Sequence, residues 1–218
     1  MLVCSVRDVF AFFISLAIVF SVILLSKILE EKKVASRDFM REFTHIVMGS
    51  WGVIWILFDT KVAATTLTLV ITLFLIFAPS KMKKIYSGGE EKHIGLILYA
   101  TMFTVVTFLF WNTRIGSLAI FTLAFSDGTA GIIGKKYGKH KYELLWTQTR
   151  SLEGSLGFYI GSIISWILAW LIYGGALLPV FMFIYSLILM VTEALSPPHT
   201  DNVIIPIVSV VMGLLIGL

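Results

Sequence analysis

The chain is poor in charged residues, cysteine and proline. Charged side chains make up only 14% of its 218 residues, against about 25% in soluble domains, and 58% of the residues are hydrophobic. This composition excludes an ordinary soluble domain. The single cysteine, Cys4, cannot form an intrachain disulfide and provides too few ligands for a structural zinc site. A net charge of +4 could indicate nucleic-acid binding, but basic residues also collect in the cytoplasmic loops of membrane proteins. We therefore do not expect nucleic acid as a partner.

Long apolar stretches are what the sequence has instead. A membrane-spanning helix needs about 20 apolar residues, and eight stretches approach that length. They cover residues 8–28, 44–60, 62–79, 94–111, 115–134, 154–173, 176–194 and 203–218. The first stretch is too long for a signal peptide and lacks a cleavage site of small residues, so we expect a retained span. The sequence therefore predicts an all-α, multi-pass membrane protein with one transmembrane domain over residues 1–218.

The basic residues predict how the spans are oriented. Fourteen of the 17 Lys and Arg residues lie in segments 26–43, 81–93 and 135–150, which follow the first, third and fifth stretches. Basic residues collect in cytoplasmic loops, so these three segments are predicted to be cytoplasmic and both termini to lie on the other side. By parity, the loop 195–202 is also cytoplasmic.

The most informative segment is 125–139. Asp127 lies about two helical turns inside a predicted span, and glycines at 128, 131, 134 and 138 follow it, together with several lysines. Glycines at this spacing let either a neighbouring helix or a phosphate approach the backbone, but helix packing does not require a carboxylate. A P-loop is excluded, because five residues separate Gly128 from Gly134 and Lys136 stands where Ser or Thr is needed.

Three further segments place polar residues at the predicted cytoplasmic ends of spans. In 149–155, Ser151 fits a helix N-cap followed by an acidic residue, Glu153, in the first turn. Alternatively, Arg150 binds a phosphate and Glu153 binds a metal ion. In 193–202, acidic and amide side chains without a basic residue suit a hard cation, although the prolines also fit a turn. In 41–45, Arg41 and His45 are four residues apart and therefore share one helix face. They are either an anchor at the membrane interface or part of a functional site.

Taken in order, these four segments resemble the CTP-dependent lipid-alcohol kinases, the family of dolichol kinase, phytol kinase and the yeast-type diacylglycerol kinase. The family motifs are R-K-x-x-H, G-D-x-x-A-x-x-x-G-[RK]-x-[FY]-G, K-[ST]-x-E-G-[ST] and E…D-N-x-x-[IV]-P. The similar positions are Arg41 with His45, then 126–138, 150–155, and Glu193 with 201–206. The resemblance covers about residues 37–210 and is specific at the motifs.

The resemblance implies transfer of the γ-phosphoryl group of CTP to the hydroxyl of a membrane lipid alcohol at the cytoplasmic face, with Mg²⁺ as cofactor. The acceptor would be a polyprenol such as dolichol, phytol or geranylgeraniol, or diacylglycerol. Such transfer needs metal ligands, cations and a proton acceptor. The membrane would be the plasma membrane in a prokaryote and an endoplasmic reticulum-type membrane in a eukaryote.

The candidate residues divide into three groups. The metal candidates are Asp127, Glu153, Glu193, Asp201 and Asn202. The candidates for binding nucleotide phosphates are Arg41, Gly128, Gly131, Gly134, Lys135, Lys136, Lys139 and Arg150. The catalytic candidates are His45, Asp127, Glu153 and Asp201, with the proton accepted by either aspartate or, less favoured, by His45.

Two departures from the family pattern keep other functions open. Ser126 replaces a frequent Gly, and Arg150 replaces a Lys, which turns a point cation into a bidentate fork. The Ser-Asp pair also resembles the phosphatidate cytidylyltransferases, which would make a CDP-lipid, but the long terminal signature of those enzymes is absent from the sequence. A non-enzymatic transporter would explain Asp127 and Glu193 as an ion path.

Overall fold

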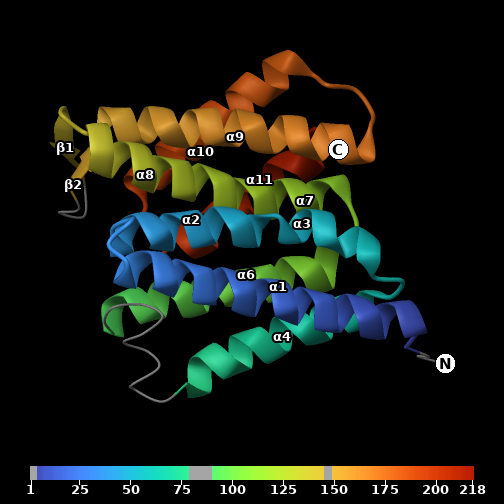
Figure 1. Ribbon diagram of the computed structural model, residues 1–218. Coiled ribbons are helices and arrows are strands. Elements are labelled where there is room, and N and C mark those ends of the chain that lie inside the picture. Colours follow the sequence, from blue (N-terminus) through green and yellow to red (C-terminus); the bar gives the residue numbers. More distant parts are fainter. Residues whose placement is uncertain (1–3, 79–89, 145–148) are drawn as a thin grey trace.

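The computed structural model describes residues 4–78, 90–144 and 149–218, and this part of the chain is almost entirely helical. The elements, labelled as in Figure 1, are α1 (Val6–Glu31), α2 (Arg37–Gly49), α3 (Trp51–Ile54), η1 (Trp55–Leu57), α4 (Lys61–Phe77), α6 (Glu90–Phe110), α7 (Arg114–Phe121), η2 (Thr122–Ser126), α8 (Asp127–Tyr137), β1 (Lys141–Glu143), β2 (Thr149–Ser151), α9 (Leu152–Tyr173), α10 (Pro179–Leu195) and α11 (Asp201–Leu215). The all-α prediction is confirmed, with the addition of one small antiparallel pair, β1 with β2.

The helices coincide with the predicted apolar stretches, with one exception. Within the described residues, four helical segments are long and apolar enough to cross a membrane, namely Val6–Glu31, His93–Phe110, Arg114–Tyr137 and Leu152–Tyr173. Three shorter apolar helices, α4, α10 and α11, match three more stretches. The stretch 44–60 is not one helix, because α2 ends at Gly49 and the chain continues as the short α3 and the 3₁₀ turn η1. These apolar helices fit a membrane protein.

The segment α7–η2–α8 forms the centre of the bundle (Figure 1), and it is the most buried of the four long apolar segments. One face of α7 and η2 packs into a cluster with Trp51, Trp55 and Phe103. The other face packs with Phe158 and Trp166 of α9 and with residues of α10 and α11. Asp127 begins α8 directly after this buried segment, so packing on both sides fixes its position.

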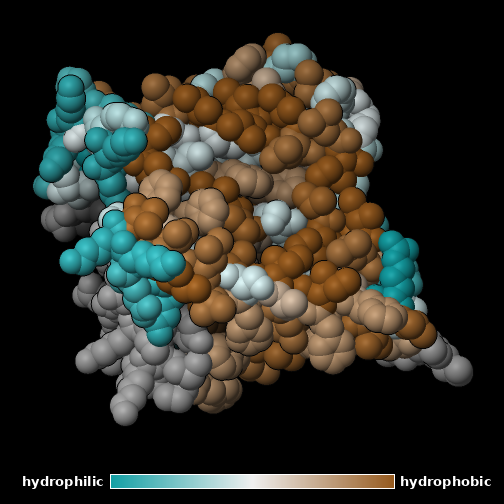
Figure 2. All heavy atoms as spheres, in the orientation of Figure 1, coloured by the Kyte–Doolittle hydropathy of each residue, from teal (hydrophilic) through white to brown (hydrophobic). Residues whose placement is uncertain are grey.

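Polar residues gather at one end of the bundle. Figure 2 shows a hydrophilic group there, over the β hairpin and the adjoining ends of α1 and α2, with a largely hydrophobic surface between this end and a smaller hydrophilic patch at the other. The described parts of the basic segments 26–43 and 135–150 lie at this end, which we call the polar end. Lys81, Lys83 and Lys84 of the third basic segment lie outside the described residues.

Candidate active site

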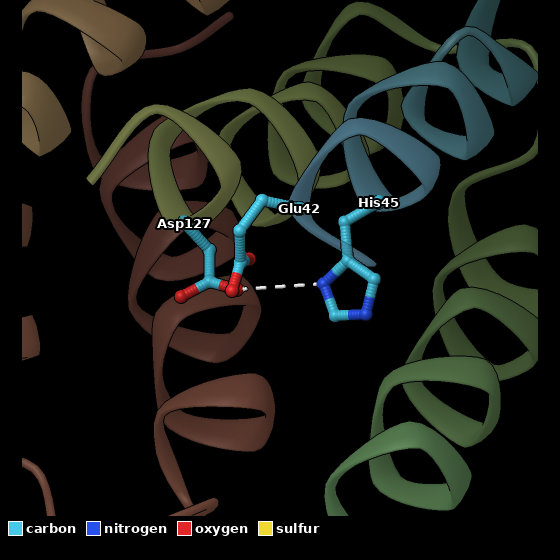
Figure 3. A group of neighbouring side chains, drawn as sticks. All are labelled: Glu42, His45 and Asp127. Atoms are coloured by element: carbon cyan, nitrogen blue, oxygen red, sulfur yellow. Dashed lines mark ion pairs between the residues drawn. The ribbon is translucent and has the colours of Figure 1, made fainter. Parts of the chain in front are cut away.

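Three side chains from two helices converge at the polar end (Figure 3). Glu42 and His45 extend from α2 and Asp127 from the start of α8, and one ligand atom of each lies within 4.8 Å of the others. The Nδ1 atom of His45 lies 3.5 Å from the Asp127 carboxylate. Tyr99 of α6 stacks on the His45 ring at 4.6 Å and donates a hydrogen bond of 3.1 Å to the His45 carbonyl oxygen. This residue set is a candidate metal and catalytic cluster.

Glu42 is the member of the cluster that the sequence analysis missed. Its side chain is 4% exposed, and its carboxylate accepts hydrogen bonds from Lys135 Nζ and from Arg41 Nη2, each at 2.7 Å. A buried charge is tolerated when it is paired in this way. The Glu-x-x-His spacing of Glu42 and His45, which puts both on one helix face, was the available signal.

Glycines allow α2 to approach α8. A Cβ atom on Gly128 would lie 2.4 Å from Ile46 Cγ1, and one on Gly131 would lie 2.6 Å from Glu42 Cδ. A Cβ atom on Gly134 would lie 3.3 Å from Ser151 Oγ, where α8 meets the hairpin. The glycine spacing therefore serves helix packing, and at Gly131 this packing brings the Glu42 carboxylate against α8.

A π-helical turn precedes Asp127. The segment η2 is held by a buried hydrogen bond of 2.7 Å between the hydroxyls of Thr122 and Tyr185, and the Tyr185 hydroxyl lies 2.6 Å from Ser209 Oγ. π-Helical turns inside α-helices occur frequently at functional sites. Each residue of an α-helix turns by about 100°, so the wider turn changes the direction in which Asp127 leaves the helix.

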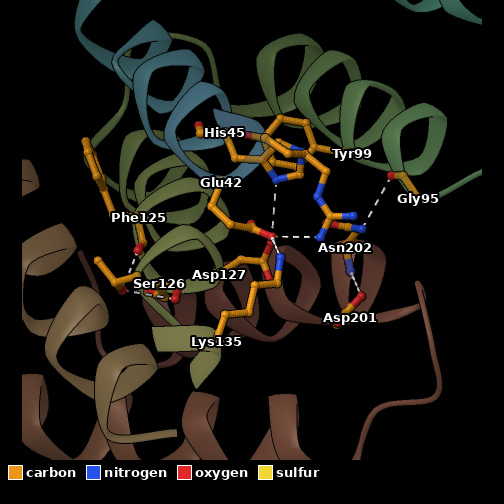
Figure 4. Close-up of polar contacts among 12 residues, drawn as sticks. Glu42, His45, Gly95, Tyr99, Phe125, Ser126, Asp127, Lys135, Asp201 and Asn202 are labelled. Atoms are coloured by element: carbon orange, nitrogen blue, oxygen red, sulfur yellow. Dashed lines mark hydrogen bonds and ion pairs between the residues drawn. The ribbon is translucent and has the colours of Figure 1, made fainter. Parts of the chain in front are cut away.

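A second polar group, from the hairpin, α10 and α11, lines the same cavity as the cluster (Figure 4 shows Asp201 and Asn202). Arg150 forms ion pairs with Glu193 and, at 3.7 Å, with Asp201. Asn202 donates a hydrogen bond of 3.4 Å to the carbonyl oxygen of Gly95 on α6. Burial and the nearby charge of Asp127 raise the pKa of Asp201 to about 6, although Arg150 opposes the shift. Asp201 and Asp127 therefore repel one another when both are ionised.

Glu153 lies apart from these carboxylates. It accepts a bond of 2.7 Å from His140 Nδ1 and bonds of 3.2–3.3 Å from the backbone N–H groups of Lys139 and His140. These hydrogen bonds lower its pKa to about 2, with the His140 side chain as the largest cause. Ser151 accepts a bond from Gly154 N as the N-cap of α9, so the helix-cap interpretation of this segment is observed.

One cavity of about 1180 Å³ joins these groups. It is slightly larger than the roughly 300–1,000 Å³ of an ordinary ligand pocket. Its polar part is lined by residues of both polar groups and by further polar residues that the sequence analysis did not assign, namely Lys27, Lys141 and His199. Lys135 lines the cavity, whereas Lys136 and Lys139 are exposed and do not line it. The Lys136 ammonium lies 5.2 Å from the ring centre of Tyr137.

The comparisons with known proteins point in one direction. No family model matches the chain, and no solved structure matches it. "Probable phytol kinase 2, chloroplastic" from Oryza sativa subsp. japonica is 25% identical over 217 aligned positions, covering 86% of this chain and 69% of that protein. "Probable phytol kinase 3, chloroplastic" from Glycine max is 25% identical over 235 positions, covering 97% of this chain and 73% of that protein. These matches confirm the predicted resemblance and support a distant relationship to lipid-alcohol kinases.

Proposed function

We propose that this protein is a CTP-dependent kinase that phosphorylates the hydroxyl of a membrane lipid alcohol at the cytoplasmic face. The observation that carries the proposal is the single cavity in which Asp127, Glu42 and Lys135 meet at the polar end of an apolar bundle. In the reaction, the bond between the γ-phosphorus and the β,γ-bridging oxygen breaks. A bond from that phosphorus to the lipid oxygen forms, the hydroxyl proton leaves, and CDP and a lipid phosphate are the products.

The carboxylates of the polar end fit Mg²⁺, which prefers oxygen ligands and keeps some waters and phosphate oxygens. In our proposal, Asp127 and Asp201 hold the ion and Asn202 supports them, because a divalent cation would relieve the repulsion between the two aspartates. The ion would neutralise charge on the transferring phosphoryl group. Glu193, paired with Arg150, and Glu153, bonded within the hairpin, then act as positioning residues.

The cations of the cavity bind the triphosphate. Lys135 and Arg41 both form ion pairs with Glu42, which holds them in the polar part of the cavity. Lys27 and Lys141 line the same part. Phosphoryl transfer depends mainly on such positioning and charge stabilisation. The hydroxyl proton passes to one of the three groups near the reaction centre, Asp127, Asp201 or His45.

We also propose that all eight apolar segments lie within the membrane, with both termini on the non-cytoplasmic side. The two described basic segments, 26–43 and 135–144, lie at the polar end together with the start of α11, as the positive-inside rule requires for a cytoplasmic face. A water-soluble nucleotide would then enter from the cytoplasm, while the lipid alcohol would arrive from within the bilayer.

An isotope experiment tests the proposed reaction. Purified protein in lipid nanodiscs is incubated with Mg²⁺, a lipid alcohol and CTP that carries label either on the γ-phosphate or on the cytosine ring. We expect γ-label in the lipid product and no cytosine label. Cytosine label in the lipid would instead identify a cytidylyltransferase, and no transfer of either label across a panel of alcohols would refute the kinase proposal.

A further inference from the structure

The cavity continues from the polar end into a part with a different lining, which we call the apolar arm. Its walls come from α1, α4 and α6, with Thr44 and Met48 of α2 beside them; representative pairs are Leu16 and Phe20 on α1, Ile71 and Phe74 on α4, and Ala100 and Phe103 on α6. The arm begins beside Tyr99, which stacks on His45. Phe103 lies one turn further along α6, about 6 Å deeper in the bundle. The arm is therefore continuous with the proposed reaction centre.

Three lining residues of the arm are well exposed, Phe20 at 58% and Val70 and Phe74 at 43% each. Its inner wall is buried, with Ala100 and Phe103 at 8% and 7%. Because Phe20 belongs to α1 and Val70 and Phe74 belong to α4, we place the mouth of the arm on the side of the bundle between these two helices, both of which carry exposed apolar residues. A molecule dissolved in lipid reaches such a mouth without crossing water.

The hydroxyl groups that line the arm already have partners. Ser26 and Thr44 hydrogen-bond to each other at 2.9 Å, and Thr68 donates a bond of 3.0 Å to the carbonyl oxygen of Thr65. Within the described residues, the arm thus presents mainly hydrocarbon to a ligand.

We propose that the apolar arm binds the hydrocarbon chain of the acceptor and is the lateral route by which its hydroxyl reaches Asp127. The hydrocarbon lining fits the chain of an alcohol whose hydroxyl lies at the polar end. This inference rests on the proposed function for the identity of the reaction, but the location of the chain can be tested without catalysis.

Photolabelling tests the location directly. A long-chain alcohol that carries a diazirine in its chain is bound to the full-length protein in nanodiscs without nucleotide, irradiated, and mapped by mass spectrometry. We expect adducts on Ile71, Ala100 and Phe103 that excess geranylgeraniol removes. Adducts that fall mainly on lipid-facing residues of α9 such as Ile160 and Ile164, or that geranylgeraniol does not remove, would overturn the proposal.

A matched pair of variants adds a kinetic test. Ala100→Leu fills the arm, whereas Ala17→Leu adds the same atoms on an exposed, non-lining position of α1. We expect Ala100→Leu to raise KM for geranylgeraniol about tenfold, as expected if roughly two methylenes of the chain leave the arm, and to leave KM for CTP unchanged. Ala17→Leu should change neither constant. Equal acceptor constants in the two variants would overturn the proposal.

The two tests separate this inference from the proposed function. Competed adducts in the arm without γ-label in any lipid would support the location and refute the kinase. Label transfer with adducts elsewhere would support the kinase and refute the location.

Discussion

Gly131 offers a test of the active-site geometry in which no functional group is removed. In Gly131→Ala, the new Cβ atom would lie 2.6 Å from Glu42 Cδ and 2.9 Å from Glu42 Cγ, so the glutamate must move. Overpacking of this kind costs about 1–3 kcal/mol, while Ala in place of Gly in a helix returns about 0.5–1 kcal/mol. We therefore expect a modest net destabilisation, between about zero and 2.5 kcal/mol.

The effect on turnover should be larger than the effect on stability. Moving Glu42 displaces Lys135 and Arg41, which it holds by two hydrogen bonds of 2.7 Å. A loss of about 1.4–3 kcal/mol of transition-state stabilisation, the range for a charged hydrogen bond, lowers kcat about 10- to 150-fold.

The measurements are γ-label transfer under saturating substrates and thermal unfolding of the same nanodisc preparation. Gly213→Ala is the control. Gly213 lies in α11, far from the polar end, and the nearest atoms to its new Cβ would be side-chain carbons of Ile115 at 3.2 Å. We expect this control to keep normal turnover. If Gly131→Ala kept turnover within a factor of two of the control, the role of the Glu42 contacts would be refuted.

Three further predictions concern single contacts. Lys135→Gln should raise KM for the nucleotide about tenfold in steady-state assays and leave KM for the lipid alcohol unchanged, because the lysine faces the polar part of the cavity. Tyr185→Phe removes the hydrogen bonds to Thr122 and Ser209, and should lower kcat severalfold without changing KM for the nucleotide, since about 1–2 kcal/mol of support for the π turn is lost. Glu153 stabilises the hairpin while it is ionised; because its pKa falls from 4.5 to about 2 on folding, this contribution is complete above pH 4.5 and is lost as the pH falls toward 2. Limited proteolysis of the hairpin should therefore be unchanged between pH 5 and 8 in the wild type, and faster throughout that range in Glu153→Gln.

Hydropathy alone predicted most of the helices, because the cost of burying polar backbone in lipid leaves few alternatives to a helix. It failed at 44–60, where α2 begins earlier, at Arg37, and ends at Gly49. A Cβ atom on Gly49 would lie 2.2 Å from Ala124 Cβ, so a tertiary contact with the central helix shapes this segment. Hydropathy averages over a window and does not register such a contact.

The site was only partly predictable from sequence. Asp127 and His45 are far apart in the chain and meet because Gly128 and Gly131 let α2 approach α8. Glu42 was missed because a charge at the edge of a span is ordinarily solvated, and only packing shows that it is buried. Glu153 was predicted as a metal ligand from its motif; the structure bonds it to His140, and the hairpin that brings the two together has no periodic signal in the sequence.

The proposed role of Asp127 in transfer of a γ-phosphoryl group to a lipid hydroxyl can be measured as γ-label in lipid for wild type and Asp127→Asn. Thermal unfolding of both proteins serves as the folding control. We expect labelled lipid phosphate from the wild type and a rate at least about 100-fold lower, near 2.7 kcal/mol in the barrier, from a folded Asp127→Asn variant. Near-normal label transfer by the folded Asp127→Asn variant would refute this role.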